Sequence, residues 1–291
     1  MKRVFLITTL LALLFASPSL TAKSKLEKVH SFSNSLNISF MSLDIRSESP
    51  VVTLFDENEE PTRFKIYLLK KNQLIFRFND VRAGTYSPDG NFYTYVKHRQ
   101  MFYVFDKNNK LLTQIPIDAT VENVCWSYDS NYVYFSTLRK DYLIHRFNVK
   151  SGKYEVLLKS YKTYFHPVTV KDTSIIYLLE NKDPESVEAY NCNIVRYYLK
   201  EKRFEKVRLP EIDKLWIANS FSVSPDNKYL IFEDFRTGLI HVVDLTTNKV
   251  IDSLSIPADI DTSIGFYCWK PDSSYVLFTV TLKEIYKYSF K

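Results

Sequence analysis

Residues 87–96 read SPDGNFYTYV, a tight-turn sequence followed by an apolar and aromatic strand sequence. The same pattern returns at 127–135 (SYDSNYVYF), 224–232 (SPDNKYLIF) and 270–278 (KPDSSYVLF). Proline presets φ for the first central position of such a turn, and aspartate bonds the backbone two residues on. Glycine or asparagine then tolerates the left-handed conformation that follows. We therefore expect four equivalent structural turns, anchored by Asp89, Asp129, Asp226 and Asp272.

The spacing of these turns predicts the architecture. Asp89 and Asp129 are 40 residues apart, Asp226 and Asp272 are 46 apart, and a degenerate copy at 171–174 lies between the two pairs. A second signature, an apolar strand ending in Asp or Asn followed by a polar turn and a lysine, comes 17, 19 and 18 residues after three of the anchors. Each unit thus reads as four strands. A four-stranded unit repeated at this interval is typical of a β-propeller.

The count of units predicts six blades in an all-β chain. Their approximate bounds are 36–80, 83–118, 121–162, 163–212, 214–258 and 262–291. The last unit is one strand short, and residues 26–32 are a candidate to supply the missing strand. Such closure would tie the two ends of the ring together and remove an open sheet edge. Five blades with an N-terminal cap is the alternative.

The first 22 residues have the layout of a cleaved secretory signal. Lys2 and Arg3 precede an uncharged apolar stretch at 4–16, and a small, polar segment ends at Ala22. Thirteen apolar residues are short of the roughly 20 that a membrane span needs. A membrane anchor is the alternative. We expect residues 1–22 to be a signal peptide, 23–35 an N-terminal segment that includes the possible closing strand, and 36–291 the propeller. The mature protein would be exported, periplasmic or secreted, without a membrane span.

Charge and cysteine content exclude several classes of protein. The 39 basic and 33 acidic residues give a net charge of +6, and removal of the signal lowers it to +4, which gives no electrostatic argument for nucleic acid. The three cysteines cannot form a fully paired set of disulfides, so we expect small buried side chains. We expect a monomer that binds no nucleic acid.

The repeated turn and strand resemble the WD40-like propeller repeat of the TolB C-terminal domain and of the prolyl oligopeptidase propeller. The best matches are 86–96, 223–232 and 269–278, and the resemblance extends from about residue 83 to the end of the sequence. The third-blade copy departs from the pattern because Tyr128 stands in place of proline. The sequence has no room for the N-terminal domain of TolB or for a hydrolase domain. The resemblance therefore implies a fold and leaves the function open.

A search for catalytic signatures finds none. The five histidines have no metal-ligand spacing, and no nucleophile elbow or glycine-rich phosphate loop is present. His145 and His241 occupy matching strands two blades apart, which predicts a repeat-inherited structural role. The sequence thus predicts no catalytic residue, no cofactor-binding residue and no metal ligand.

Two features favour binding. Aromatic residues make up 15% of the sequence, and tyrosines on a face favour contact with proteins or sugars. Blade 4 has an insertion at 181–191 whose candidate binding residues are Lys182, Asp183, Pro184 and Glu185. The leading hypothesis is a non-enzymatic scaffold for a protein or peptide partner. The alternatives are a lyase or glycan hydrolase with channel residues dispersed over several blades, and a sugar-binding module. Ionisable groups converging at a channel mouth would favour the enzyme, and an exposed aromatic patch would favour the binder.

Overall fold

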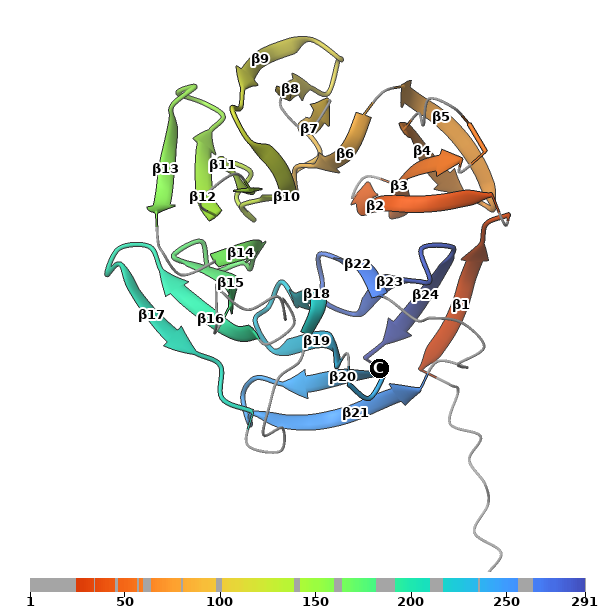
Figure 1. Ribbon diagram of the computed structural model, residues 1–291, viewed down its shortest axis with the longest axis vertical. Helices are drawn as coiled ribbons and strands as arrows, with labels where there is room; N and C mark the ends of the chain where they lie inside the picture. The colour runs from red at the N-terminus through yellow and green to blue at the C-terminus, as the bar shows by residue number, and fades with distance from the viewer. Residues whose placement is uncertain are drawn as a thin grey trace, which may run out of the picture.

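The structure, a computed structural model, describes residues 25–290 apart from short internal segments. The segments left undescribed are 34, 45–46, 57, 60–63, 80, 98–100, 139–141, 160–163, 182–191, 210–216, 235 and 256–263. The described residues form 24 strands and no helix, so none of them belongs to a helix that could cross a membrane. The strands make six four-stranded sheets arranged in a ring (Figure 1). The predicted six-bladed β-propeller is therefore confirmed, and the five-bladed alternative is wrong.

The strands follow one another as antiparallel meanders. Blade 1 holds β2 (Leu36–Asp44), β3 (Ser49–Asp56), β4 (Phe64–Lys70) and β5 (Gln73–Asn79), and blade 2 holds β6 (Val81–Tyr86), β7 (Phe92–Lys97), β8 (Met101–Asp106) and β9 (Leu111–Pro116). Blade 3 holds β10 (Thr120–Trp126), β11 (Tyr132–Leu138), β12 (Tyr142–Asn148) and β13 (Tyr154–Lys159), and blade 4 holds β14 (Tyr164–Thr169), β15 (Ile175–Asn181), β16 (Cys192–Tyr198) and β17 (Arg203–Lys206). Blade 5 holds β18 (Ile217–Val223), β19 (Tyr229–Asp234), β20 (Leu239–Asp244) and β21 (Lys249–Ser255).

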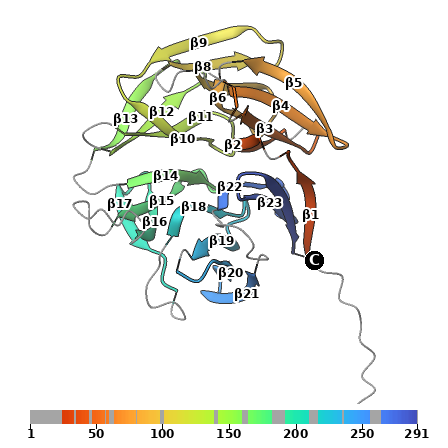
Figure 2. The same ribbon diagram turned by 45° about the vertical axis from the view of Figure 1, so that its right-hand side comes forward.

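Blade 6 joins the two ends of the propeller sequence. Its strands are β22 (Ile264–Trp269), β23 (Tyr275–Val280), β24 (Glu284–Ser289) and, from the N-terminal segment, β1 (Leu26–Ser31). β1 pairs antiparallel with β24, and Leu26 lies opposite Tyr288. The ring is thus closed by a strand that comes before the first blade in sequence (Figure 2).

The burial of each strand follows its place in the blade. The second strands are apolar on both faces because neighbouring blades cover both, as in β15 and β19, where five or six successive residues are buried. The outer strand β21 instead alternates between exposed and half-buried residues, as a half-wet edge strand should. The apolar core is therefore divided among the seams between adjacent blades.

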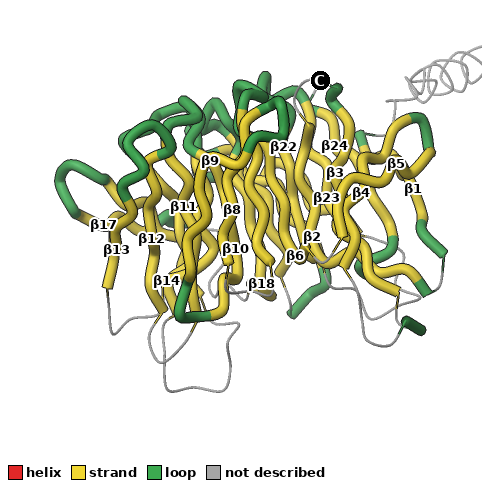
Figure 3. The backbone as a smooth tube through the Cα atoms, turned by 90° about the horizontal axis from the view of Figure 1, so that it is seen from above, coloured by secondary structure: helices red, strands yellow, loops and turns green. Residues whose placement is uncertain are grey.

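Three of the four repeated turns are built around a serine and the aspartate two residues later. The Ser87 hydroxyl donates to Asp89 Oδ1 at 2.6 Å and accepts the backbone N–H of Phe92 at 2.9 Å. Ser127 and Ser224 repeat both bonds in blades 3 and 5. These turns lie on one side of the ring, next to the ends of the inner strands (Figure 3). Each of these serines is therefore buried and satisfied by its own turn.

The residue after each turn aspartate has a positive φ: 69° at Gly90, 59° at Ser130, 62° at Asn227 and 63° at Ser273. The two serines also join blades. The Ser130 hydroxyl accepts the backbone N–H of Asp89 at 3.0 Å, and the Ser273 hydroxyl accepts that of Asp226 at 3.1 Å. Serine at this position thus offsets the cost of the left-handed conformation with a bond to the preceding blade.

Hydrogen bonds lower the pKa values of three turn aspartates, Asp89, Asp129 and Asp272. Bonds from Ser274 lower the pKa of Asp272 to about 2, with the Ser274 backbone N–H at 2.9 Å. Partial burial acts to raise the pKa of Asp89, but the bonds donated by Ser87 and Asn91 outweigh it, and the pKa is lowered. The folded state therefore favours the ionised carboxylates.

Acid should destabilise the fold through these carboxylates. Their folded pKa values lie below the unfolded value of about 3.9, so their contribution is complete above about pH 5 and is lost as pH falls toward 2. The Asp272→Asn variant keeps an acceptor but does not titrate, so its urea midpoint should fall less between pH 5 and pH 2.5 than that of the unmodified protein. Glu122→Gln, an exposed site outside the turns, is the control. An equal fall in Asp272→Asn would contradict this reading.

Candidate functional site: the central channel

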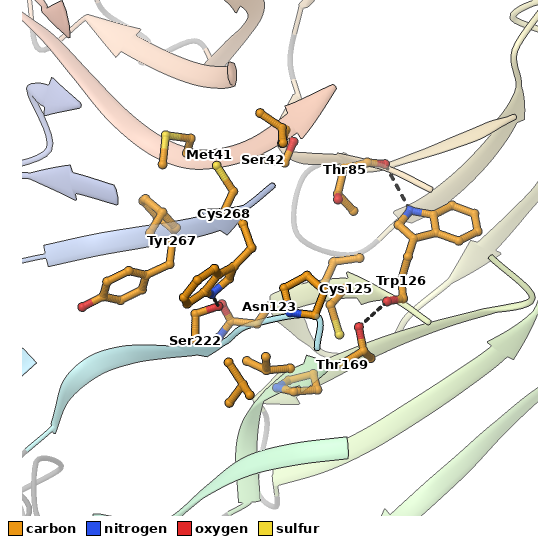
Figure 4. A pocket seen from close by; sticks show the side chains of 18 of the residues that line it. Met41, Ser42, Thr85, Asn123, Cys125, Trp126, Thr169, Ser222, Tyr267 and Cys268 are labelled. Atoms are coloured by element: carbon orange, nitrogen blue, oxygen red, sulfur yellow. Dashed lines mark hydrogen bonds between the residues drawn. The ribbon is translucent and has the colours of Figure 1, made fainter. Parts of the chain in front are cut away.

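The six inner strands surround a cavity of about 220 Å³ at the centre of the ring. Each of β2, β6, β10, β14, β18 and β22 contributes residues to its wall. Pro88, Tyr128, Pro225 and Pro271 of four repeated turns also line it, so the cavity reaches the turn side of the ring. Figure 4 shows side chains from several inner strands around this one space.

Every inner strand carries a bulge or irregularity before or within the part that lines the cavity. The register of pairing shifts once in each, for example between Val121 and Asn123 in β10 and between Phe165 and Val168 in β14. A bulge bends a strand and increases its local twist, which suits strands that must pass close to a common axis. The cavity-lining residues of β10, Asn123 to Trp126, begin where the bulge ends.

The cavity wall contains no aspartate, glutamate, lysine or arginine among the described residues. Its ionisable groups are His166, the thiols of Cys125 and Cys268, and tyrosine hydroxyls. Burial lowers the pKa of His166 to about 4, and burial raises the pKa of Cys268 to about 12 and that of Cys125 as well. All three groups are therefore neutral near pH 7. The described wall of the channel offers no charged acid–base pair and no thiolate nucleophile.

Several polar groups of the wall join neighbouring blades. The Trp126 indole N–H donates to the Thr85 carbonyl at 3.2 Å, and the Trp269 indole N–H donates to the Ser222 hydroxyl at 3.1 Å (Figure 4). The Thr169 hydroxyl in turn donates to the Trp126 carbonyl at 2.5 Å. The repeat pattern aligned the two tryptophans but assigned no role to them. Their partners lie one repeat earlier, 41 and 47 residues away. The spacing of the repeats is therefore the sequence signal that could have indicated these partners.

Tyr128 reaches across the mouth of the channel. It stands where the three other turns have proline, and its hydroxyl donates to the Pro271 carbonyl at 3.1 Å. Tyr128 belongs to blade 3 and Pro271 to blade 6, which are opposite one another in a ring of six. The Lys171 ammonium lies 5.4 Å from the centre of the Tyr128 ring. Tyr128 therefore links two opposite blades across the turn side of the cavity, and we call this contact the strut.

The residues predicted from sequence divide into two groups. Asp89, Asp129, Asp226 and Asp272 lie in the turns between first and second strands, and each accepts a backbone N–H from two residues on. They are brought to one side of the ring but do not form a common site. The candidate binding loop, Lys182, Asp183, Pro184 and Glu185, lies outside the described residues.

The histidines do not assemble a metal centre in the part of the sequence that the structure describes, where no group of three metal-binding side chains occurs. His145 is buried between two hydroxyl groups, with Thr137 Oγ1 at 2.8 Å from Nε2 and the Tyr154 hydroxyl at 2.8 Å from Nδ1. His241 contacts the Ser253 hydroxyl through Nδ1 at 2.9 Å. Both histidines contribute to the packing of their own blades.

Comparisons with known proteins give a fold and no family. No family model matches the sequence, and no curated protein matches it. Among solved structures, the protein is similar to hydrazine synthase of Kuenenia stuttgartiensis, with a TM-score of 0.60 and 11% identity. The match covers 87% of this protein and 97% of that one. At this identity the likeness shows the propeller fold alone.

The strut should contribute measurably to stability. Tyr128→Phe keeps the ring and removes the hydroxyl, so the loss of one hydrogen bond should lower the free energy of unfolding by about 1 kcal/mol. Tyr103→Phe is the control, because the described residues give its hydroxyl no hydrogen-bond partner. The measurement is urea unfolding at neutral pH. Equal stability of Tyr128→Phe and the unmodified protein would show that the hydroxyl bond does not hold the two blades.

Proposed function

We propose that the protein is an exported, non-enzymatic propeller that binds a protein or peptide partner. The observation that carries this proposal is an exposed apolar surface on the outer strands of blades 1 and 2. In β5, Leu74, Ile75 and Phe76 are 37%, 40% and 51% exposed, and in β9 both Leu111 and Leu112 are 44% exposed. Five of the nine large apolar side chains exposed among the described residues lie on these two strands.

The charge pattern of the outer strands sets these two apart. β5 has one charged residue, Arg77, and β9 has none. The outer strands of the other four blades each carry at least two charged residues, as in β17 (RFEK) and β1 (LEKVHS). Charges on an edge strand discourage association with other proteins, and contiguous exposed apolar residues favour it. A partner that covers blades 1 and 2 accounts for this difference.

The partner would contact side chains rather than add a strand to the sheet. Both edge strands carry a bulge, at Arg77 in β5 and at Leu112 in β9, where one residue is skipped in the pairing with the inner neighbour. A bulge twists the edge and interrupts its row of free backbone groups, which weakens strand addition. The exposed rings and aliphatic side chains remain available as anchors for a binding partner.

The channel gives no support to the enzyme alternative. Its described wall has no carboxylate, lysine or arginine, and its histidine and thiols are neutral near pH 7. General acid–base catalysis needs groups that exchange protons near the working pH. The propeller named for an enzyme, hydrazine synthase, is 11% identical, so its activity does not transfer. Export is supported by the basic, apolar and small-residue order of the first 22 residues.

The outer surface of blade 1 is tested by capture of a partner from cells of the source organism. The bait is the tagged protein, compared with a double variant, Ile75→Thr with Phe76→Thr, which keeps strand propensity and removes apolar surface. The matched control is Val156→Thr with Ile251→Thr, on the outer strands of blades 3 and 5. We expect the unmodified protein and the control to retain the same partner, and the blade 1 variant to retain at least tenfold less.

Two results would contradict the proposal. Equal retention by all three baits would show that blade 1 is not the contact surface. Recovery of no specific protein by the unmodified bait would remove the partner-binding function itself.

A further inference from the structure

A second hollow, of about 260 Å³, lies at the seam between blades 1 and 2. Residues 76–78 of β5 form one side of it, and the start of β7 with the turn between β8 and β9 forms the other. The end of β6 supplies Tyr86, which also lines the central channel. We call this hollow the seam groove. It borders the exposed apolar surface of β5, because Phe76 belongs to both.

The turn of blade 2 carries no side chain that bridges this seam. At the seam between blades 4 and 5, Asn227 accepts the Tyr177 hydroxyl at 2.5 Å, and Ser130 and Ser273 make the corresponding reach at two other seams. Blade 2 has Gly90 at that position, with the same positive φ but no side chain to extend across the seam. Gly90 is one of the residues that line the groove.

The buried apolar cluster of this seam is also the smallest. Among the described residues, its buried apolar cluster has three members, Val51, Ile66 and Leu68, whereas the clusters at the other five seams have seven to fifteen. Stacked aromatic rings supply further packing at this seam. Phe78 stacks on Tyr93 with ring centres 5.4 Å apart, and Tyr93 stacks on Phe105 at 5.0 Å. Mutual stacking gives the groove a rigid aromatic wall.

The charge of the groove is positive. Arg77 and Lys107 both line it, and no aspartate or glutamate of the described residues does. Neither cation forms an ion pair with a carboxylate of the described residues. Asp106, which precedes Lys107 in sequence, accepts the backbone N–H groups of Asn108 and Lys110 at 2.8 and 2.9 Å. The bulge in β5 falls at Arg77 and re-aims this side chain relative to its neighbours.

We infer that the seam groove binds a short peptide segment in which an aromatic or aliphatic side chain stands beside a carboxylate. The inference rests on the proposed function, because it names the chemistry of the partner that blades 1 and 2 accept. The apolar side chain packs on Phe76 and Phe78, and the carboxylate lies between Arg77 and Lys107, where a guanidinium can hold it through two hydrogen bonds. The groove is slightly smaller than the roughly 300 Å³ of the smallest drug-sized pockets, so it accommodates one or two side chains.

The carboxylate has two possible sources, an acidic side chain and the terminal carboxylate of a peptide. Four probe peptides separate them: acetyl-Ser-Phe-Glu-Ser-amide, acetyl-Ser-Ser-Gly-Phe with a free C-terminus, and the uncharged counterparts acetyl-Ser-Phe-Gln-Ser-amide and acetyl-Ser-Ser-Gly-Phe-amide. Binding is followed by amide chemical-shift changes in the ¹⁵N-labelled full-length mature protein. We expect at least one carboxylate peptide to bind tenfold or more tighter than its uncharged counterpart. Shifts should concentrate at Arg77, Gly90 and Lys107, and should weaken with added salt.

Two variants test the site. Gly90→Asn should fill the groove without breaking the turn, because Asn227 has the same conformation in the equivalent turn of blade 5. It should weaken the preferred peptide at least tenfold. Arg77→Gln removes a cation and leaves the turn untouched, and it should reduce the preference for the carboxylate. The matched control is Asn227→Gly, which makes the reverse change at another seam and should leave peptide binding unchanged.

Three results would overturn the inference. They are equal binding of the charged and uncharged peptides, shifts that lie away from the seam, and unchanged binding in both Gly90→Asn and Arg77→Gln. Tighter binding of glucuronate than of either carboxylate peptide would replace the peptide ligand with an acidic sugar. Partner capture that depends on Ile75 and Phe76 without peptide binding at the seam would keep the proposed function and reject this inference. Peptide binding at the seam without partner capture would do the opposite.

Discussion

The fold depends on the pairing of β1 with β24, which turns a row of blades into a closed ring. Backbone bonds continue on both sides of the ladder, from Ser289 N–H to the Lys25 carbonyl at 2.9 Å and from Phe32 N–H to the Lys283 carbonyl at 2.8 Å. Within the pair, Ile285 and Tyr288 of β24 are fully buried. Without β1 the outer edge of blade 6 would be a bare strand, and these side chains would lose their cover.

Within the closed ring, single residues at the repeated turns add hydrogen bonds between blades to the apolar packing of the seams. Ser130, Asn227 and Ser273 each reach the preceding blade, and Tyr128 spans the mouth to the opposite one. Gly90 has no side chain to bridge its seam. Among the described residues this seam has the smallest buried apolar cluster, and it contains the seam groove. Four turns thus share one backbone conformation; at three of them a side chain bridges the seam, and at the fourth, with Gly90, the seam groove lies open.

The fold was predictable from sequence because its signals are local and repeated. The turn serine and aspartate, the apolar second strand and the spacing of about 40–50 residues are all properties of one blade. The contacts between blades were not predictable. Tyr128 was recognised as a departure from the pattern, but its partner Pro271 is 143 residues away, and only the ring brings them together. The seam groove was missed for the same reason, since Phe76, Gly90 and Lys107 belong to different turns and strands.

Ring closure can be measured directly with an engineered disulfide. Glu27 of β1 lies opposite Lys287 of β24, so Glu27→Cys with Lys287→Cys should cross-link on oxidation. The account predicts that the oxidised double variant unfolds at a higher temperature than its reduced form, because the bond restricts the unfolded polypeptide between the two ends of the ring. Failure of the disulfide to form in the folded protein, or an unfolding temperature that reduction does not lower, would contradict closure through β1.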